Sequence, residues 1–254
     1  MKGKSRYLAT RVNNKETPKE IAKEFSQRYE LLFNSVPSNS ETLTELLCNT
    51  RNDISGMSDD NVWCHSHQIT IQSVKDIICK MKRGKSGGDT YLCSDNFIYG
   101  TEKLYYCITC KFNAMLVHGC APGSLSMSVL VPIPKDRRGN MSNIDNYRAI
   151  ALSDIMSKIF DSIIIESQGK YLYTSDLQFG YKKHSSTVIC TTVLLETLNH
   201  FKCQGGPVFV LFIDASKAFD RLCHSDLFLI LREREMCPVY LRILLSMYKC
   251  HRPK

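Results

Sequence analysis

The chain has 254 residues, of which 43% are hydrophobic and 23% charged, so it has enough apolar side chains for a sizeable core. Its formal charge of +8 suits a polyanionic partner such as nucleic acid, although a mildly basic protein without such a partner fits the charge equally well. No apolar run approaches the roughly 20 residues of a membrane span, so we expect a soluble or peripheral protein.

Twelve cysteines are scattered along the chain, and Met1–Arg6 leads into no apolar stretch of the kind found in a secretory signal. We therefore expect an intracellular protein, in a reducing compartment of the nucleus or the cytoplasm, with free and mostly buried thiols. Two clusters resemble zinc ligands, Cys107-Ile108-Thr109-Cys110 and Cys64-His65-Ser66-His67. Each lacks a second half at a usual spacing, so a zinc site is not expected.

The first predicted helix spans residues 18–34. It begins with a capping box at Thr17-Pro18-Lys19-Glu20, and Ile21, Phe25, Tyr29 and Leu32 follow at helical spacing. Residues 35–68 are polar and weakly patterned, which predicts a loosely structured connector with a short helix near Leu43–Leu47. Thr70 is the expected N-cap of the next helix, which ends before the glycine-rich turn Gly84–Asp89.

A third helix is predicted over about residues 101–118, and Gly119 ends it. Apolar side chains then alternate at Met127, Val129, Val131 and Ile133, which predicts a half-buried strand over 126–134. Residues 147–152 predict a returning strand, and the apolar run 207–213 a buried one. Helices are predicted at 154–167, 186–203, 225–235 and 238–250. These elements together predict an α/β (α+β) fold.

An acid follows the predicted strand 207–213 directly, and an aromatic residue follows five positions later. A strand that ends in a carboxylate holds the charge at a sheet edge, where a divalent cation can bind it. Asp214 is therefore a candidate metal ligand, and a strand-terminal acid in a turn is the plain alternative. Phe219 is either an ordinary core residue or part of the same site. Lys217 is interpreted as a local structural cation, and Asp220 as a cap or anchor of the following turn.

The two strands near residues 126–134 and 147–152 predict a hairpin with a basic loop. Lys135 would lie near one end of the hairpin, and Arg148 on the returning strand. A point charge and a planar guanidinium on one hairpin suit a triphosphate. A basic surface loop with solvated charges is the alternative.

These stretches, in this order, resemble the reverse transcriptases of non-LTR (LINE-type) retrotransposons. Residues 208–220 are similar to the first palm motif of that family, and the similarity covers about residues 80–250. Four other motifs are similar. Lys85–Thr90 lacks the family's two prolines and final glycine, and Pro134-Lys135 is followed by Asn146–Leu152, with Ala149 where the family most often has proline. The other two are Phe112–Leu116, followed by Gly119 and Pro122, and Gln178–Tyr181 with Ser186-Thr187.

The resemblance implies a reverse-transcriptase-like right-hand polymerase fold, with a helical N-terminal extension and connector over residues 1–68 and a reverse transcriptase domain fragment over 69–254. The fingers would span about 69–205 and the start of the palm about 206–254. It further implies an RNA-directed DNA polymerase that uses Mg²⁺, dNTPs, an RNA template and a DNA primer. In that family the residue at Asp214 binds the magnesium, Phe219 excludes the ribose 2′-hydroxyl, and Lys135 and Arg148 contact the phosphates of the incoming nucleotide.

Two later palm motifs of the family do not occur in this sequence, a glycine-rich Arg-Gln-Gly turn and a Tyr-x-Asp-Asp hairpin. The acids after Asp220 are Asp226, Glu233 and Glu235, all on helical patterns. Because two-metal catalysis needs several converging carboxylates, we expect a truncated fragment that is inactive by itself and leaves the apolar surface of its palm strand uncovered. The alternatives are a non-catalytic RNA-binding protein derived from a retroelement and a soluble α/β domain with coincidental similarity.

Overall fold

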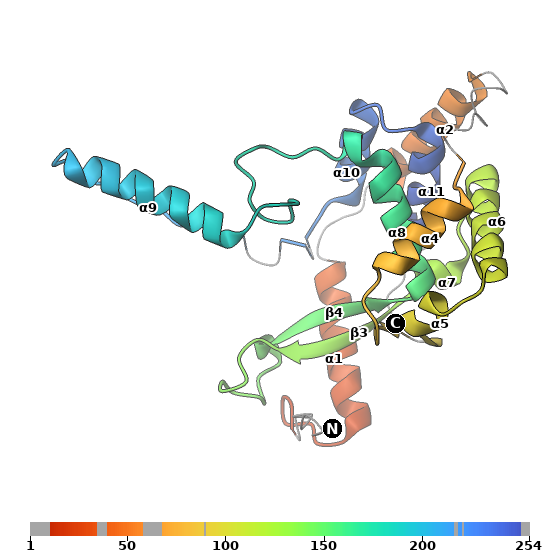
Figure 1. Cartoon of the computed structure of the whole chain (residues 1–254). Coiled ribbons are helices and arrows are strands. Elements are labelled where there is room, and N and C mark those ends of the chain that lie inside the picture. Colours follow the sequence, from red (N-terminus) through yellow and green to blue (C-terminus); the bar gives the residue numbers. More distant parts are fainter. Residues whose placement is uncertain are drawn as a thin grey trace.

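The computed structural model describes residues 11–34, 40–57, 68–88, 90–215, 218–219 and 221–249. Within them helices combine with two small antiparallel sheets, so the predicted mixture of helices and strands is confirmed. Figure 1 shows a helical body, a long hairpin below it with α1 alongside, and α9 projecting away from both. The helices are α1 (Pro18–Phe33), α2 (Ser40–Ser55), α4 (Ile71–Lys80), α5 (Ser94–Ile98), α6 (Glu102–His118), α7 (Gly123–Ser126), α8 (Ile155–Gln168), α9 (Thr187–Cys203), α10 (His224–Glu233) and α11 (Pro238–Lys249); the strands are β1 (Ser86–Gly87), β2 (Thr90–Cys93), β3 (Ser128–Pro134) and β4 (Tyr147–Ser153).

Most of the predicted helices are confirmed, because their local signals act as expected. The Thr17 hydroxyl accepts a hydrogen bond from the Glu20 N–H at the start of α1. At the start of α4, Thr70 and Ser73 form a reciprocal capping box. Gly119 ends α6 in the left-handed conformation, with φ of 66°. The helices predicted near 154–167, 186–203, 225–235 and 238–250 correspond to α8, α9, α10 and α11.

Helix α2 is longer than the short helix predicted inside a loose connector. It spans sixteen residues, and its Leu46 is 2% exposed. Leu43, Leu47 and Ile54 pack against the same core, and α2 lies alongside α11. Its many polar residues weaken the pattern when the sequence is read alone. Packing against α11, which begins more than 180 residues after α2 ends, makes this narrow apolar stripe sufficient to hold α2 on the core.

The main core lies among α2, α4, α6, α8, α10 and α11. Phe112 of α6 and Phe160 of α8 are fully buried, with their ring centroids 5.0 Å apart. Tyr240 and Ile243 bring α11 into the same cluster. This core fixes the base of the β3–β4 hairpin, because β4 leads directly into α8 and β3 follows α7.

A second, smaller core joins the hairpin to α1. Tyr147, at the start of β4, packs edge-on against Phe25 with ring centroids 5.0 Å apart, and Tyr29 stacks beside Phe25. The predicted hairpin is confirmed, with Ile133 opposite Arg148 and Pro134 opposite Tyr147. The expected alternation of buried and exposed residues along β3 is weak, because residues on both faces are partly covered.

The prediction of a buried strand at 207–213 is wrong. Residues 206–215, named here the apolar connector, form neither helix nor strand and join α9 to the segment before α10. Phe209 is 93% exposed and Ile213 is 87% exposed. The segment has the composition of a buried strand, but a strand needs a neighbour to satisfy its backbone groups, and no described residue provides one. The expectation of an uncovered apolar surface is confirmed.

The cysteines in the described residues are free, but the expectation that most are buried is wrong. Of the ten in the described residues only Cys237 is buried; Cys107 and Cys110, for example, lie on the exposed side of α6. The Cys64-His65-Ser66-His67 cluster lies outside the described residues. Among the helices that are described, none has the length and hydropathy that crossing a membrane requires.

Gly119 allows α11 to approach the end of α6 closely. A Cβ at this position would overlap the Arg242 guanidinium, which donates hydrogen bonds to the Leu116 and Val117 carbonyls at 2.7 and 3.0 Å. We expect Gly119→Ala to reduce the free energy of unfolding by about 1–3 kcal/mol, through backbone strain and displacement of Arg242. Urea denaturation checks this. Gly123→Ala is the control because a Cβ there meets nothing within 4 Å; an equal loss in both variants would contradict the explanation.

Candidate functional site

The β3–β4 hairpin carries the predicted phosphate-binding cations at its distal end. Lys135 follows β3 directly, and its N–H donates to the Asn146 carbonyl at 2.6 Å, which extends the ladder by one pair. Its Nζ donates to the Asp145 carbonyl at 2.8 Å. Strand geometry places residues such as Lys135 and Arg148, which are diagonal neighbours across the ladder, roughly 7–8 Å apart at Cα on one face. The register therefore places the two predicted residues at the same end of the hairpin.

Each residue of the Asn146-Tyr147-Arg148 motif has a separate role in the hairpin. Asn146 holds the basic loop, because its amide donates to the Asp136 carbonyl at 2.8 Å and its side-chain oxygen accepts from the Asp136 N–H at 3.1 Å. Tyr147 is buried, and its hydroxyl donates to the Met141 carbonyl. Arg148 is exposed and forms no hydrogen bond or ion pair with another described residue. It is consequently free to bind an anion.

The side of the hairpin opposite α1 is open to solvent. Ile133 and Ile150 are 43% and 39% exposed on this face, next to Arg148. The loop beyond it adds Arg137 and Arg138, whose side chains also lack a partner among the described residues. On the other side, Arg28 of α1 forms a 2.6 Å ion pair with Asp145, which fixes the loop to α1. The result is a supported hairpin with unpaired positive charge at its end.

The glycine-rich turn at residues 84–88 packs against the base of this hairpin. A Cβ on Gly88, which has φ of 69°, would overlap the Leu152 carbonyl of β4. Lys158 of α8 donates a hydrogen bond to the Ser86 carbonyl at 3.1 Å and holds the turn in place. The glycine-rich turn and strand β4, which are separated by about 60 residues in the sequence, are thus in contact. Asp89 lies outside the described residues.

Phe219, which is predicted to exclude the ribose 2′-hydroxyl, contacts the Gln178–Tyr181 motif. Its ring lies 5.5 Å from that of Tyr181, centroid to centroid, at 77°. Both side chains are largely exposed, Phe219 at 76% and Tyr181 at 93%. The interpretation of Phe219 as an ordinary core residue is therefore wrong. No pattern in the sequence indicates Tyr181 as its neighbour, because the two residues lie on separate loops.

Asp214 lies in the apolar connector and is exposed. It has no hydrogen bond or ion pair with another described residue, and no described contact joins it to Lys135 or Arg148. Across the described part of the chain no three His, Cys, Asp or Glu side chains are close enough to hold a metal ion. One carboxylate does not make a magnesium site, so the described residues do not fit that ion by themselves. Lys217 and Asp220 lie outside the described residues.

The Phe112–Leu116 motif has a structural role in the main core. Phe112, Met115 and Leu116 are buried in the main core. Asn113 exchanges two 2.9 Å hydrogen bonds with the backbone of Ile69 and so fixes the chain just before α4. This motif stabilises the helical body and contributes no catalytic or binding group among the described residues.

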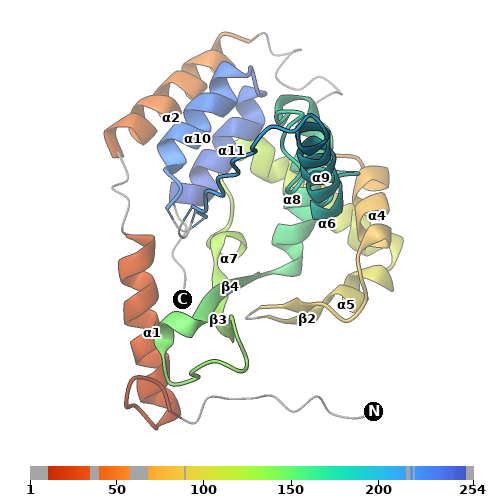
Figure 2. The ribbon, with the colours of Figure 1, turned by 90° about the vertical axis from the view of Figure 1, so that its left-hand side faces the viewer.

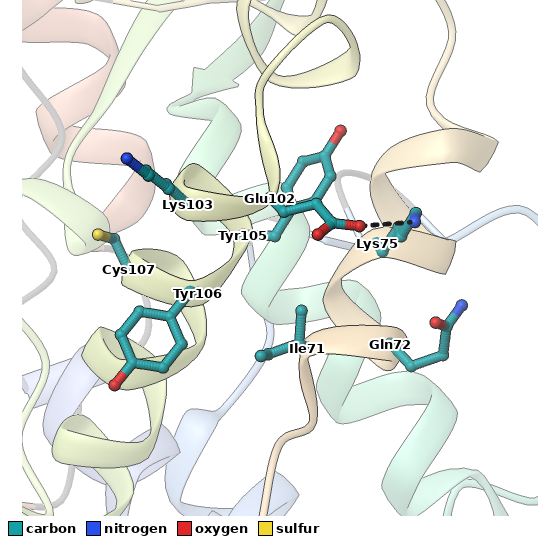
Figure 3. Close-up of a pocket in the computed structure, with 8 residues that line it drawn as sticks. All are labelled: Ile71, Gln72, Lys75, Glu102, Lys103, Tyr105, Tyr106 and Cys107. Carbon is teal, nitrogen blue, oxygen red and sulfur yellow. Dashed lines mark ion pairs between the residues drawn. The ribbon is translucent and has the colours of Figure 1, made fainter.

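A surface hollow of about 710 Å³ lies between α4 and α6, away from the hairpin. Figure 3 shows Lys75 forming an ion pair with Glu102 on one side of it and Tyr106 beside Cys107 on the other. None of the predicted site residues lines it. Its polar groups do not converge on one point, so it does not have the form of a catalytic site.

Asp161 of α8 has the most altered carboxyl group in the described chain. Desolvation raises its pKa to about 6, although the residue is exposed and water therefore screens part of this effect. Burial, and then the charge of Asp161, raise the pKa of the Tyr248 phenol on α11. The Tyr248 ring contacts His224 and Phe228. The sequence holds no local signal for this link between α8 and α11, because Tyr248 lies more than 80 residues after Asp161.

Comparison with known proteins points in the same direction as the sequence words. The chain is 23% identical over 167 residues to the RNA-directed DNA polymerase from mobile element jockey of Drosophila funebris. The match covers 63% of this chain and 18% of that protein, so the chain spans less than a fifth of the relative's length. No family model matches. The match supports a distant relationship to the reverse transcriptases of non-LTR retrotransposons.

Proposed function

We propose that this chain is the fingers and the first part of the palm of a LINE-type RNA-directed DNA polymerase. The observation that carries the proposal is the hairpin, which presents Lys135 and the unpaired Arg148 at one end of a supported ladder. The distant jockey match and the ordered words support the same assignment. In this proposal Lys135 and Arg148 bind the triphosphate of an incoming dNTP, and the partners are a primed RNA template and dNTPs.

In the proposal Phe219, with Tyr181 beside it, contacts the sugar of the incoming nucleotide and excludes the 2′-hydroxyl. Asp214 would be one ligand of magnesium together with carboxylates that this sequence does not contain. We expect the 254-residue polypeptide by itself to bind a primed template without extending it. A non-catalytic RNA-binding protein is the second candidate, and the unpaired cations Arg137, Arg138 and Arg148 favour it as much as they favour a polymerase.

Primer extension with the purified chain, a primed RNA template, dNTPs and Mg²⁺ tests this expectation. Asp214→Asn is compared with Glu233→Gln, a control that neutralises an exposed acid on α10. We expect binding of the template and no incorporation by any of the three proteins. Incorporation that Asp214→Asn abolishes and Glu233→Gln retains would show that the polypeptide is an active polymerase, contrary to our expectation. Failure to bind template at low salt would contradict both candidate functions.

A further inference from the structure

Two of the exposed cysteines lie one turn apart on the outer face of α6. Cys107 and Cys110 are both free, at positions i and i+3, whereas Ile108 and Phe112 on the opposite face of the helix pack into the main core. Helix α6 lies at the right-hand edge of the body in Figure 1 and at the back in Figure 2, on the side opposite α9. Helical geometry places the Cβ atoms of such a pair about 5–6 Å apart. The two thiols are therefore neighbours that solvent reaches.

This spacing suits a shared metal ion better than a disulfide. A disulfide needs Cβ atoms about 3.5–4.5 Å apart, so its formation here would distort α6. Two metal–thiolate bonds of about 2.3 Å on opposite sides of an ion span about 4.6 Å. Two sulfur atoms reach that separation when both side chains lean toward each other in ordinary helical rotamers. The pair can therefore hold an ion while the helix stays intact.

The number of ligands indicates which ion the pair suits. No third His, Cys, Asp or Glu side chain in the described part of the chain joins the two thiols. Zn²⁺ normally takes four ligands, whereas Cu⁺ is a soft ion that thiolates select and that two of them satisfy in a linear arrangement. We propose that Cys107 and Cys110 form a two-coordinate site for Cu⁺ on the outer face of α6. Binding changes no oxidation state: two thiols and one Cu⁺ give a bis-thiolate complex of charge −1 and two released protons.

The groups around the pair suit a complex with one negative charge. Lys103 precedes Cys107 by one turn and Lys111 follows it by one turn, and both lysines are exposed. Figure 3 shows the Lys103 amine and the Cys107 sulfur on the same side of α6. The Tyr106 hydroxyl donates a hydrogen bond to the Cys110 sulfur; this hydrogen bond, and then the charge of Cys110, raise the pKa of the Tyr106 phenol. The phenol therefore keeps its proton and supports a thiolate bound to the ion, as donors beside metal ligands commonly do.

Moving one thiol along the helix tests the site. In Cys107→Ser, only Cys110 of the pair remains. Adding Ala114→Cys to this variant puts a second thiol one turn from Cys110, whereas adding Val117→Cys puts it two turns away, roughly 10.5 Å along the axis at about 1.5 Å per residue. Both positions are exposed, so the two double variants keep the thiol count of the unchanged chain and differ in the spacing of the pair. Competition with bicinchoninate for Cu⁺ under anaerobic, reducing conditions gives the affinity of each full-length protein, and far-UV circular dichroism checks that each is folded.

We expect the unchanged chain to bind one Cu⁺ at least tenfold more tightly than Cys107→Ser, and the double variant with Ala114→Cys, but not the one with Val117→Cys, to restore this affinity. The control Cys190→Ser, which removes an exposed thiol from α9, should bind like the unchanged chain. Copper K-edge absorption of the unchanged chain should show two sulfur ligands. Equal affinities of the unchanged chain and Cys107→Ser would overturn the proposal, as would an equal loss in Cys190→Ser, restoration by both double variants or by neither, or three or more sulfur ligands.

Discussion

Phe112→Ala is expected to reduce the free energy of unfolding by about 3–5 kcal/mol, the usual range for a fully buried aromatic side chain that is truncated to alanine. Phe112 is 0% exposed, and its ring contacts Phe160 across the α6–α8 interface. The truncation leaves a cavity between two helices that carry other core residues, so local collapse cannot close it cheaply. Urea or guanidinium denaturation of the full chain measures the loss.

The matched control is Tyr106→Ala on the same helix. Tyr106 is 58% exposed, so its truncation removes an aromatic ring of similar size without opening a core cavity. We expect a loss below about 1 kcal/mol. If the two variants lost similar stability, or if the unchanged chain unfolded without a cooperative transition, the core among α4, α6 and α8 would not be packed as described. A non-cooperative transition would indicate a loosely packed globule.

Neutralising the two hairpin cations should weaken binding to nucleic acid strongly. The double variant Lys135→Gln and Arg148→Gln removes two charges that lie together at the end of a supported hairpin. If both contact phosphates, we expect at least a tenfold weaker affinity for a primed RNA template at low salt. The slope of log affinity against log salt concentration should fall by about 2 in magnitude. Fluorescence anisotropy with a labelled template, repeated over a salt series, measures both quantities.

A charge-matched control separates a site from general attraction. Lys103→Gln and Lys111→Gln remove two exposed cations from α6, away from the hairpin (Figure 1). We expect this variant to bind within about threefold of the unchanged chain, because non-specific attraction depends on the whole charge distribution. Equal weakening in the two double variants would mean that the hairpin is not the contact surface, and the proposed roles of Lys135 and Arg148 would then be wrong.

Local signals in the sequence were sufficient to predict the segments that form their backbone hydrogen bonds within themselves. The capped helices α1 and α4, the glycine-terminated α6 and the hairpin all follow from residues close in sequence: Thr17, Thr70, Gly119 and the alternating residues before Pro134. The placement of Lys135 and Arg148 on one hairpin also followed from sequence, because a hairpin register depends on adjacent strands and the loop between them.

Only the tertiary structure decided the features that depend on distant partners. The length of α2 depends on α11, the effect of the Asp161 charge on the Tyr248 phenol depends on α8 and α11, and the contact between Phe219 and Tyr181 depends on two loops. The apolar connector shows this dependence on a distant partner most clearly. Its composition determines that it is suited to pairing, but a strand forms only with a neighbour, because an extended backbone cannot satisfy its own hydrogen bonds.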